Sequence, residues 1–437
     1  MRLYAVLFAV GLAVYGGLAW DRLGKQSIAP QFVIQADAWL HGHLDVQPVT
    51  SDADWAKLET VTLADGREVQ GRRMTTKPLF RTLSGEHIPT NQIRQSKGFT
   101  WYVSFPPVPA VLMLPSALIG GRGGNDVIPT VLIAAAILPL FLLVLRRLRA
   151  AQLSTRTETE ELWLVALLAF GTVLFFSSVQ GKVWYTAQVC GVALALVYTW
   201  ASIEAKHPLA AGLALGAAAL TRTAMAFMLP LFLFELWRSR RGEWKQVCVR
   251  FAIPVVAFAI AGMVYNALRF HSPTEFGHTY LDARQQIQIE QFGLASYHYL
   301  ARNLAVMLTL LPEWLGHRPW LQISGHGLAI WVTTPALLLL LWPKEKPPIH
   351  RALWITVACV AAPSLLYMNS GWVQFGYRFS LDYVVFLVVL LAIGGRPISR
   401  VLIGVCIAVN LFGAVTFDRD WKYYRVGGTA YDVVMAN

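Results

Sequence analysis

Apolar residues along this chain come in repeated runs that are long enough to cross a lipid bilayer. A membrane-spanning helix needs about 17 to 25 predominantly apolar residues. Clear examples of runs near this length are 127–144, 162–177, 251–267, 330–342, 352–366, 384–393 and 401–415. The pattern predicts an all-α polytopic membrane protein with about 11 transmembrane helices and a large extracytoplasmic first loop.

The polar stretches between these runs divide the chain into six segments. The predicted order is a first transmembrane helix over 1–20, an extracytoplasmic loop with amphipathic helices and a re-entrant or interfacial segment over 21–126, transmembrane helices over 127–270, a second extracytoplasmic loop over 271–325, transmembrane helices over 326–416 and an extracytoplasmic tail over 417–437. The first run follows Arg2 as in a signal peptide but has no clear small-residue cleavage site. We interpret it as a retained signal anchor.

The first loop contains local patterns of its own. Residues 31–44 predict a short amphipathic helix, and 61–69 predict a β-hairpin that turns at Asp65-Gly66. Residues 105–121 are apolar but contain four prolines. If this last segment crossed the membrane, the arginines at 146–149 would lie outside. We therefore predict a re-entrant or interface-lying helix there.

Composition supports the membrane class, and the charge pattern adds an orientation. Apolar residues make up 56% of the 437 residues and charged residues 14%, whereas a soluble chain carries about 25% charged residues. The excess of Lys and Arg that gives the net charge of +12 collects in short loops, which is typical of the cytoplasmic side. The three main basic clusters are Arg146, Arg147, Arg149 and Arg156; Arg238, Arg240, Arg241, Lys245 and Arg250; and Lys344, Lys346 and Arg351. Placing them inside gives an inner N-terminus and an outer C-terminus, and it predicts no nucleic-acid partner.

Cysteines and histidines give no sign of a metal centre. Cys190, Cys248, Cys359 and Cys406 lie in or beside apolar spans without CxxC spacing, so we predict small core residues rather than ligands or disulfides. The histidines show no HExxH or other paired-ligand spacing. The sequence predicts no protein metal site and leaves a divalent cation open as a cofactor.

Candidate chemistry lies in the predicted outer loops, because the short cytoplasmic loops have no nucleotide-cradling glycine pattern. Asp37 and Asp45 follow the first span, where a carboxylate could act as a general base or simply occupy a solvated helix face. Arg222 joins two short apolar spans, where its planar fork could bind phosphate or reach lipid headgroups. Tyr102 stands in the aromatic and proline-rich stretch 101–109, which could also be an interfacial belt.

Two further groups of polar residues stand at the boundaries of predicted spans. Arg378 and Asp382, four residues apart beside Tyr377, could form an anion site at a helix start or a structural ion pair. The segment 265–280 leaves a span with Arg269, Glu275 and His278 closely spaced, the last two lying in the loop.

Taken in order, these segments resemble the C-type polytopic glycosyltransferase superfamily, and within it the bacterial family-39-like members related to protein mannosyltransferases and lipid A aminoarabinose transferase. The resemblance is carried by 32–45, 102–110 with Leu114-Pro115, 219–222, 266–277 and 375–382. It implies transfer of a sugar from a polyprenyl-phosphate carrier, with inversion, to a lipid, glycan or protein acceptor. It also implies a multi-pass protein of the bacterial inner membrane, surrounded by lipid and active on its extracytoplasmic face.

The resemblance also implies roles for individual residues. Asp37 becomes the catalytic base candidate. The family's acidic pair after the first span is missing here, where a lone Asp21 stands, so Asp45 and Glu275 are substitutes for it. The donor phosphate-binding candidates are Arg222, Arg378 and Arg269, and the substrate-binding candidates are Tyr102, Tyr377, Asp382 and His278.

Two other functions fit the same features. One is a flippase or transporter of a lipid-linked sugar, but transporters favour internal repeats, and no repeat is visible in this sequence. The other is an oligosaccharide ligase or polymerase that uses diphosphate-linked donors. Only the chemistry of the donor separates that alternative from a polyprenyl-phosphate-dependent transferase.

Overall fold

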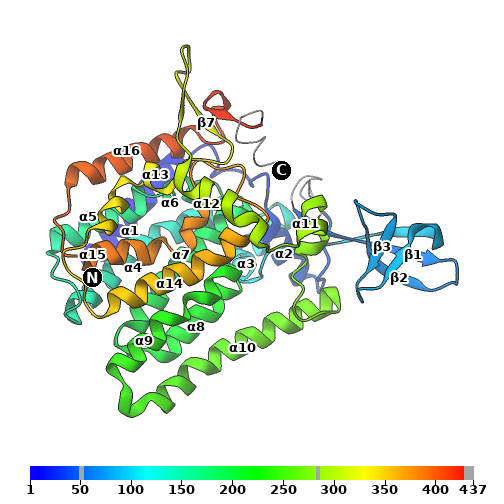
Figure 1. Ribbon diagram of the computed structural model, residues 1–437, viewed down its shortest axis with the longest axis horizontal. Coiled ribbons are helices and arrows are strands. Elements are labelled where there is room, and N and C mark those ends of the chain that lie inside the picture. The colour runs from blue at the N-terminus through cyan, green and yellow to red at the C-terminus, as the bar shows by residue number, and fades with distance from the viewer. Residues whose placement is uncertain (49–53, 282–285, 428–437) are drawn as a thin grey trace.

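The computed structural model describes residues 1–48, 54–281 and 286–427, and most of them lie in helices that form one elongated body (Figure 1). Within these residues, four helices are long and apolar enough to cross a membrane: α4 (Val127–Ala150), α7 (Val183–Ser202), α10 (Trp244–Phe270) and α14 (Ile349–Leu366). Five shorter helices are also apolar: α1 (Arg2–Leu18), α3 (Val108–Gly120), α8 (Pro208–Ala219), α15 (Val384–Ile393) and α16 (Arg400–Thr416). The predicted total of about 11 spans stays a prediction.

The remaining helices are short and connect or cap the apolar ones. They are α2 (Gln31–Leu40), α5 (Glu158–Phe170), α6 (Leu174–Ser178), α9 (Leu229–Ser239), α11 (Gln286–Phe292), α12 (Leu300–Thr309) and α13 (Ile330–Thr333). Local sequence explains the start of α5, where the Thr157 side chain accepts from the Glu160 amide and the Glu160 carboxylate accepts from the Thr157 amide. This reciprocal capping box satisfies amides that a helix start leaves without partners.

The helices pack closely where glycines replace larger side chains. A Cβ at Gly212 would lie 2.2 Å from the Phe251 carbonyl oxygen, and one at Gly216 would lie 2.6 Å from the Phe258 ring, so α8 and α10 touch almost backbone to backbone. Small residues allow such approaches between membrane helices. Every residue of α15 is buried, as expected for a helix that is apolar all round.

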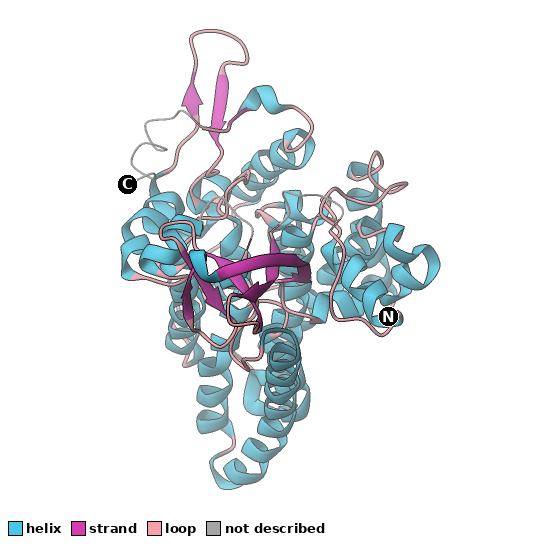
Figure 2. Cartoon of the chain, turned by 90° about the vertical axis from the view of Figure 1, so that its right-hand side faces the viewer, coloured by secondary structure: helices cyan, strands magenta, loops and turns pink. Residues whose placement is uncertain are grey.

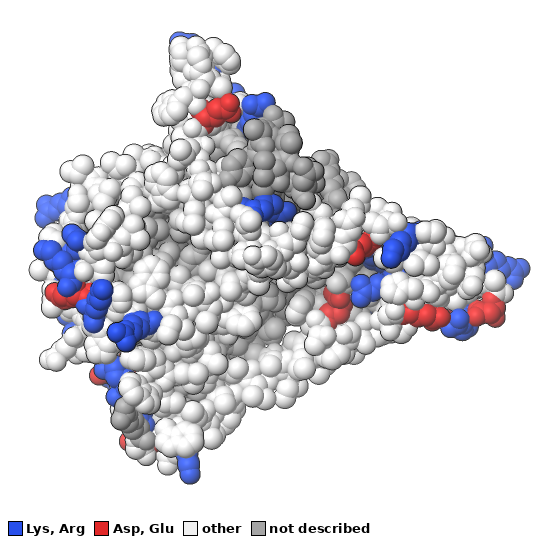
Figure 3. Space-filling model, viewed as in Figure 1, with Lys and Arg blue, Asp and Glu red and all other residues white. Residues whose placement is uncertain are grey.

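The three basic clusters meet at one end of the body, which we call the basic end. Arg147 and Arg240 both bond to Glu204, which joins the first two clusters. Arg156 donates to the Ala392 carbonyl, and Arg396 nearby donates to the carbonyl of Trp342, beside the third cluster. In Figure 3, Lys and Arg gather at this end and at the opposite tip, and the broad face between carries few charges. The contacts therefore agree with the grouping that the positive-inside pattern predicted.

The first loop corrects the all-α prediction, because it contains a five-stranded antiparallel sheet in the order β4-β3-β2-β1-β5 (Figure 2). Its strands are β1 (Trp55–Leu63), β2 (Glu68–Arg73), β3 (Leu79–Thr82), β4 (His87–Pro89) and β5 (Ile93–Val103). The predicted hairpin is confirmed, with Gly66 at φ +86° in the turn between β1 and β2. The other strands escaped prediction because polar residues occupy both faces of β2 and much of β5, which removes the alternation that marks a strand.

The sheet is held by the second loop. The Glu290 carboxylate of α11 accepts from Arg72 of β2, from the amides of Thr75 and Thr76, and from the Thr76 hydroxyl. The ion pair is largely shielded from water, with 5% of the Glu290 side chain exposed. The two predicted outer loops therefore form one cap over the end of the body opposite the basic end, which we call the loop end.

We expect Glu290→Gln to loosen this cap. Loss of a shielded charge pair should lower the free energy of unfolding by about 2 kcal/mol, and hydrogen exchange at the Thr75 and Thr76 amides should speed up. Glu68→Gln is the matched control, because Glu68 pairs with Lys97 on the exposed surface and should contribute less than about 1 kcal/mol. Equal protection of both amides in the two variants would contradict the role of Glu290.

Two segments differ in detail from their predicted form. Helix α2 ends at Leu40 rather than at 44, because Gly42 turns the chain with φ +78°, and its residues from Gln31 to Asp37 are all buried against α3 and its surroundings. The predicted solvated face of this helix is therefore absent. Within 105–121, helix α3 begins after Pro107, and the Val108 amide donates to the Leu220 carbonyl. Whether this segment spans the membrane stays a prediction.

Candidate functional site

Charged groups from distant parts of the chain meet at the loop end, beneath the cap. Arg222 lies between α8 and the 3-10 helix η4 (Thr223–Met228), and Arg378 and Asp382 delimit the 3-10 helix η9. Asp54 immediately precedes β1, and His278 begins the 3-10 helix η6 (His278–Tyr280). Each group stands where a regular element begins or ends, so its backbone is fixed by a neighbouring element.

Asp382 pairs with Arg222 and not with Arg378. The Asp382 carboxylate accepts from Nε of Arg222 at 2.5 Å and from Nη2 at 2.8 Å. Of the two alternatives left open by the sequence, the structural ion pair between Arg378 and Asp382 is not formed, because η9 is a 3-10 helix, in which residues four apart do not stack on one face. The pair with Asp382 raises the pKa of Arg222, although burial alone would lower it. Arg222 is therefore held rigidly as a cation.

Arg378 is buried with part of its guanidinium unpaired. Its Nε donates to the Gly371 carbonyl at 3.0 Å, and its ring neighbours are Tyr185 and Phe379, at 5.4 and 5.2 Å. Its two Nη nitrogens make no hydrogen bond to any residue that the structure describes. Burial, and then the charge of Arg222, lower the pKa of Arg378. Unpaired donors on a buried cation are suited to an anionic ligand.

The Asp54 carboxylate interacts electrostatically with Arg378. Its Oδ2 accepts from the Trp184 indole nitrogen at 2.9 Å, and its backbone carbonyl accepts from the Ser104 hydroxyl at 3.0 Å. Burial raises the pKa of Asp54 above the ordinary value of 3.8, although the Trp184 hydrogen bond and the Arg378 charge act against it. A buried carboxylate with a raised pKa is a candidate proton acceptor.

Sequence reasoning missed Asp54. The signal available was the pair of acids in Asp52-Ala-Asp54-Trp55, directly before the strand that opens the sheet. The sheet itself was not predicted beyond its first hairpin, so nothing in the sequence marked this position as the place where the loop returns to the body.

His278 lies within electrostatic range of Arg222 and Arg269. Its ring centroid is 6.3 Å from that of Phe105 and 6.4 Å from that of Tyr367, and its buried Nδ1 has no hydrogen-bond partner among the described residues. Burial, followed by the charges of Arg222 and Arg269, lowers the pKa of His278 to about 4. The imidazole is therefore neutral at pH 7 and can donate or accept one hydrogen bond at each nitrogen.

We expect His278→Gln to make the protein less sensitive to acid. Because folding lowers the pKa of this imidazole from 6.5 to about 4, the unfolded chain binds the extra proton first. Its contribution to stability is complete above about pH 6.5 and is lost as the pH falls toward 4, by up to about 3 kcal/mol. The melting temperature measured from pH 7 to pH 4 should fall less steeply for the variant than for the parent. Parallel curves would contradict this assignment.

Arg269 uses most of its hydrogen-bond donors in bonds within the protein. It donates from Nη1 to the Val103 carbonyl at 2.7 Å and from Nη2 to the Asn266 side-chain oxygen at 3.0 Å, and it stacks on the Tyr265 ring at 3.9 Å. These contacts tie the end of α10 to the end of β5. Of the three arginines predicted for phosphate, Arg269 thus has the fewest donors left.

The three carboxylates suggested by the sequence lie elsewhere. Asp37 is buried 3.6 Å from the His41 ring nitrogen, and Asp45 is exposed at the same distance from His43. Glu275 accepts from the Gly277 amide at 2.7 Å and from the Thr279 hydroxyl at 2.6 Å, which closes its own turn. Among the described residues none of the three forms an ion pair with Arg222 or Arg378, because each is satisfied by neighbours within a few residues.

The two predicted tyrosines differ in their surroundings. Tyr377 is buried beside Arg378, and its hydroxyl has no partner within the described part of the chain. Tyr102 lies on β5 and packs edge-on against Phe270 at 5.3 Å. Tyr377 is therefore the tyrosine that could still offer a hydroxyl to a ligand near the arginines.

A cavity of ≈ 330 Å³ opens beside this cluster, between α3, α8 and α10. Its wall is almost entirely apolar, and Arg269 and Asn266 provide its polar end. Residues that line it include Pro106, Pro107, Leu220, Phe227 and Phe276. The cavity can hold an extended apolar group whose polar end points toward the arginines.

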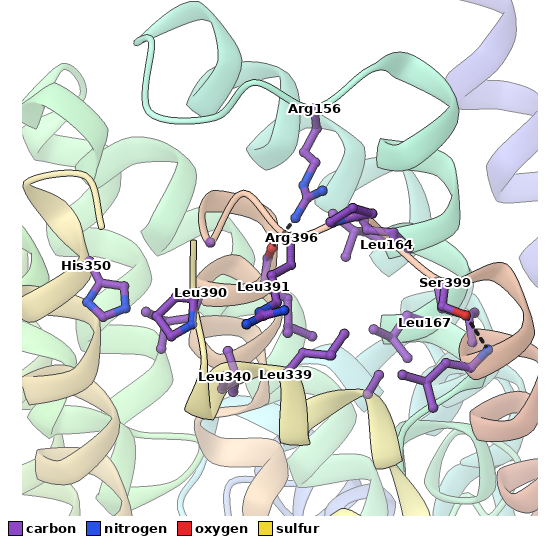
Figure 4. Close-up of a pocket in the computed structure, with 17 residues that line it drawn as sticks. Arg156, Leu164, Leu167, Leu339, Leu340, His350, Leu390, Leu391, Arg396 and Ser399 are labelled. Atoms are coloured by element: carbon purple, nitrogen blue, oxygen red, sulfur yellow. Dashed lines mark hydrogen bonds between the residues drawn. The ribbon is translucent and has the colours of Figure 1, made fainter. Parts of the chain in front are cut away.

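A second, much smaller pocket of ≈ 30 Å³ lies at the basic end (Figure 4). Arg156, Arg396 and His350 stand at its rim above several leucines. A water needs about 10–15 Å³ of such space, so the pocket holds about two or three waters. Arg156 is also bonded to the carbonyls of Leu391 and Ala392, and the pocket does not compete with the cluster at the loop end.

No group of three or more His, Cys, Asp or Glu side chains that could hold a metal ion occurs within 1–48, 54–281 and 286–427. The four cysteines are free; Cys190 and Cys406 are buried, and Cys248 and Cys359 are half-buried.

Comparison with known proteins gives one family match. The model of glycosyltransferase family 87 matches residues 102–363. Two structures of the Archaeoglobus fulgidus oligosaccharyltransferase, the apo form and a form tethered to an acceptor peptide, are similar at 12% identity, with TM-scores of 0.47 and 0.42. The alignment covers 99% of this chain and 57% of that enzyme, so this chain spans little more than half of its length. No curated protein matches the sequence.

Proposed function

The chain belongs to glycosyltransferase family 87, and from that membership we propose that it transfers a sugar from a polyprenyl-phosphate carrier to an acceptor hydroxyl on the extracytoplasmic face of a bacterial inner membrane. The family is of the GT-C type, which confirms the predicted superfamily. The closer resemblance to family 39 is not confirmed. Since the family consists of glycosyltransferases, the enzyme is preferred to the transporter alternative.

One observation carries the proposal: the half-buried Asp54 carboxylate interacts electrostatically with the buried Arg378, whose outer nitrogens are unpaired. Asp54 supplies the proton acceptor, and Arg378 supplies donors for an anion. The two groups interact, since the charge of Arg378 acts on the pKa of Asp54. The proton acceptor and the anion site therefore belong to one cluster, as a displacement at a single carbon requires.

The proposed reaction is a single displacement at the anomeric carbon. The acceptor oxygen forms its bond to that carbon while its proton passes to Asp54. The bond from the carbon to the carrier phosphate breaks, and the electron pair leaves on the phosphate. Arg378 stabilises the departing phosphate electrostatically. Arg222, held in place by its pair with Asp382, adds positive charge to the same cluster. Attack opposite the leaving group gives inversion.

Neutral His278 and the hydroxyl of Tyr377 have open hydrogen-bonding positions near the same arginines. Sugars present hydroxyls that both donate and accept, and neutral groups bind them without competing for the phosphate charge. We assign these two residues to the sugar. The apolar cavity beside Arg269 would take the first isoprene units of the carrier.

The test is turnover by the purified protein in vesicles with defined donors. Polyprenyl-phosphate hexoses and pentoses should be consumed with release of polyprenyl phosphate, and one of them should be strongly preferred. Consumption of diphosphate-linked sugars alone would favour the ligase or polymerase alternative. Movement of intact donor across the vesicle without turnover would overturn the proposal.

A further inference from the structure

A tryptophan-rich hairpin leaves the side of the helical body near the ends of α13 and α16. Strands β6 (Glu313–Trp314) and β7 (Leu321–Ser324) form it, and β7 pairs on its other side with β8 (Tyr424–Arg425). Figure 1 shows the hairpin pointing upward, across the long axis of the molecule, whereas the five-stranded sheet extends the body along that axis. In Figure 2, after a quarter turn about the vertical axis, the hairpin again points upward from the helical body.

The hairpin exposes aromatic residues rather than burying them. Trp314 is 76% exposed and Trp320 is 56% exposed, and Leu311 beside them is 55% exposed. His317 and Arg318 are exposed at the turn. Large exposed apolar groups mark a surface that another phase or molecule covers. Indoles accompanied by cations are typical of the boundary between lipid tails and headgroups.

Other exposed tryptophans lie at the level of the hairpin. Trp421 lies three residues before the start of β8, so it is next to the base of the hairpin. Trp20 lies in the turn after α1, beside Asp21, which pairs with Arg419, two residues before Trp421. A second set, Trp237, Trp244 and Trp342, is exposed next to the basic clusters. The two sets bracket the apolar face of the body as interfacial belts do.

We propose that the β6–β7 hairpin is a membrane-interface anchor that lies in the headgroup layer at the loop end. Trp314 and Trp320 seat it against the lipid, and Arg318 faces the lipid phosphates. The partner is the bilayer surface and not a second protein, because the hairpin combines indoles and a cation at the level of the other exposed tryptophans.

The base of this anchor is hydrogen-bonded to the candidate site through Gln374. What this link means for the site rests on the proposed function. The carbonyls of Gly325 and His326, directly after β7, accept from the backbone and side-chain amides of Gln374, at 3.0 and 2.8 Å. The side-chain oxygen of Gln374 in turn accepts from the Arg378 amide at 2.9 Å. Seating the hairpin therefore fixes the depth of Arg378 relative to the lipid phosphate layer.

The experiment measures the depth of the hairpin tip without measuring activity, so its result is independent of the proposed function. An environment-sensitive fluorophore is attached to Gly316→Cys in the full chain, reconstituted in phosphatidylcholine vesicles with phosphatidylglycerol. No atom lies within 4 Å of where a Cβ would stand at Gly316, so the label does not disturb packing. Labelling of the unsubstituted chain gives the background from its own cysteines. Asn91→Cys in the exposed sheet and Ile260→Cys on the exposed apolar face of α10 are the references.

We expect a quencher on the lipid headgroup to act on position 316 at least twofold more strongly than one deep in the acyl chain. The order should reverse at Ile260, and Asn91 should be quenched by neither. Trp314→Ser combined with Trp320→Ser should return position 316 to the behaviour of Asn91, whereas Trp342→Ser should not. A label at 316 that resembles either reference in the parent chain, or that is shielded from water without lipid quenching, would overturn the proposal.

Discussion

Asp54→Asn should reduce kcat about a thousandfold while leaving the fold intact. Asparagine keeps an acceptor for the Trp184 indole but cannot take a proton from the acceptor hydroxyl, and general-base catalysis contributes about 10²–10⁴-fold. Folding should not suffer, because removing a buried carboxylate with a raised pKa removes a desolvation cost. The measurement is steady-state turnover of the donor together with the melting temperature.

Asp37→Asn is the matched control, since Asp37 is also a buried carboxylate of the first loop but pairs with His41. We expect it to keep turnover within about threefold of the parent, because it leaves the proton acceptor in place. If Asp37→Asn lost activity and Asp54→Asn kept it, the base would be Asp37, as the sequence first suggested.

The pH profile gives an independent check of the base. Because the folded pKa of Asp54 lies above 3.8, kcat/KM should fall as the pH decreases through a value higher than that of an ordinary aspartate. The carboxylate is protonated and inactive below that value and charged above it. An acid limb at the ordinary value would argue against Asp54.

Arg378→Ala should lower kcat/KM for the donor by about a hundredfold or more. The change removes the unpaired donors and the charge that stabilise the leaving phosphate, and comparable electrostatic groups are worth about 10²–10³ in rate. Arg378→Lys should recover only part of the loss, because an ammonium group replaces the charge but not the fork. Unchanged donor kinetics in both variants would mean that Arg378 is a structural residue.

We also expect the residual activity of Arg378→Ala to depend on pH differently from that of the parent. The positive charge of Arg378 lowers the pKa of Asp54, so its removal should raise that pKa further and move the acid limb to higher pH. A purely structural role for Arg378 would not move the limb in this direction. The shift separates electrostatic contact with the base from a general loss of folding.

Parts of the site could be predicted from the sequence because placing a charged side chain beside an apolar run is energetically costly wherever it occurs. An arginine such as Arg222 or Arg378 at the boundary of an apolar run needs a partner or an anion, and both lie in the cluster. His278 also belongs to the cluster. The choice of partner could not be predicted, because Asp382 is 160 residues from Arg222 and only four from Arg378. Sequence spacing offered Arg378 as the partner of Asp382, since four-residue spacing pairs side chains in an α-helix but not in the 3-10 helix that the chain forms here.

The sequence by itself determined the class of the protein: apolar runs of membrane length, basic clusters that share one end, and a first loop with its own hairpin. These properties are set by composition within windows of a few turns, where hydrophobic burial and backbone hydrogen bonding decide the outcome. Only the tertiary structure decided which carboxylate of the first loop interacts electrostatically with Arg378: Asp54 does, while Asp37 lies beside His41. That choice depends on the sheet and on its attachment through Glu290, which join residues more than 200 positions apart and leave no periodic trace in the sequence.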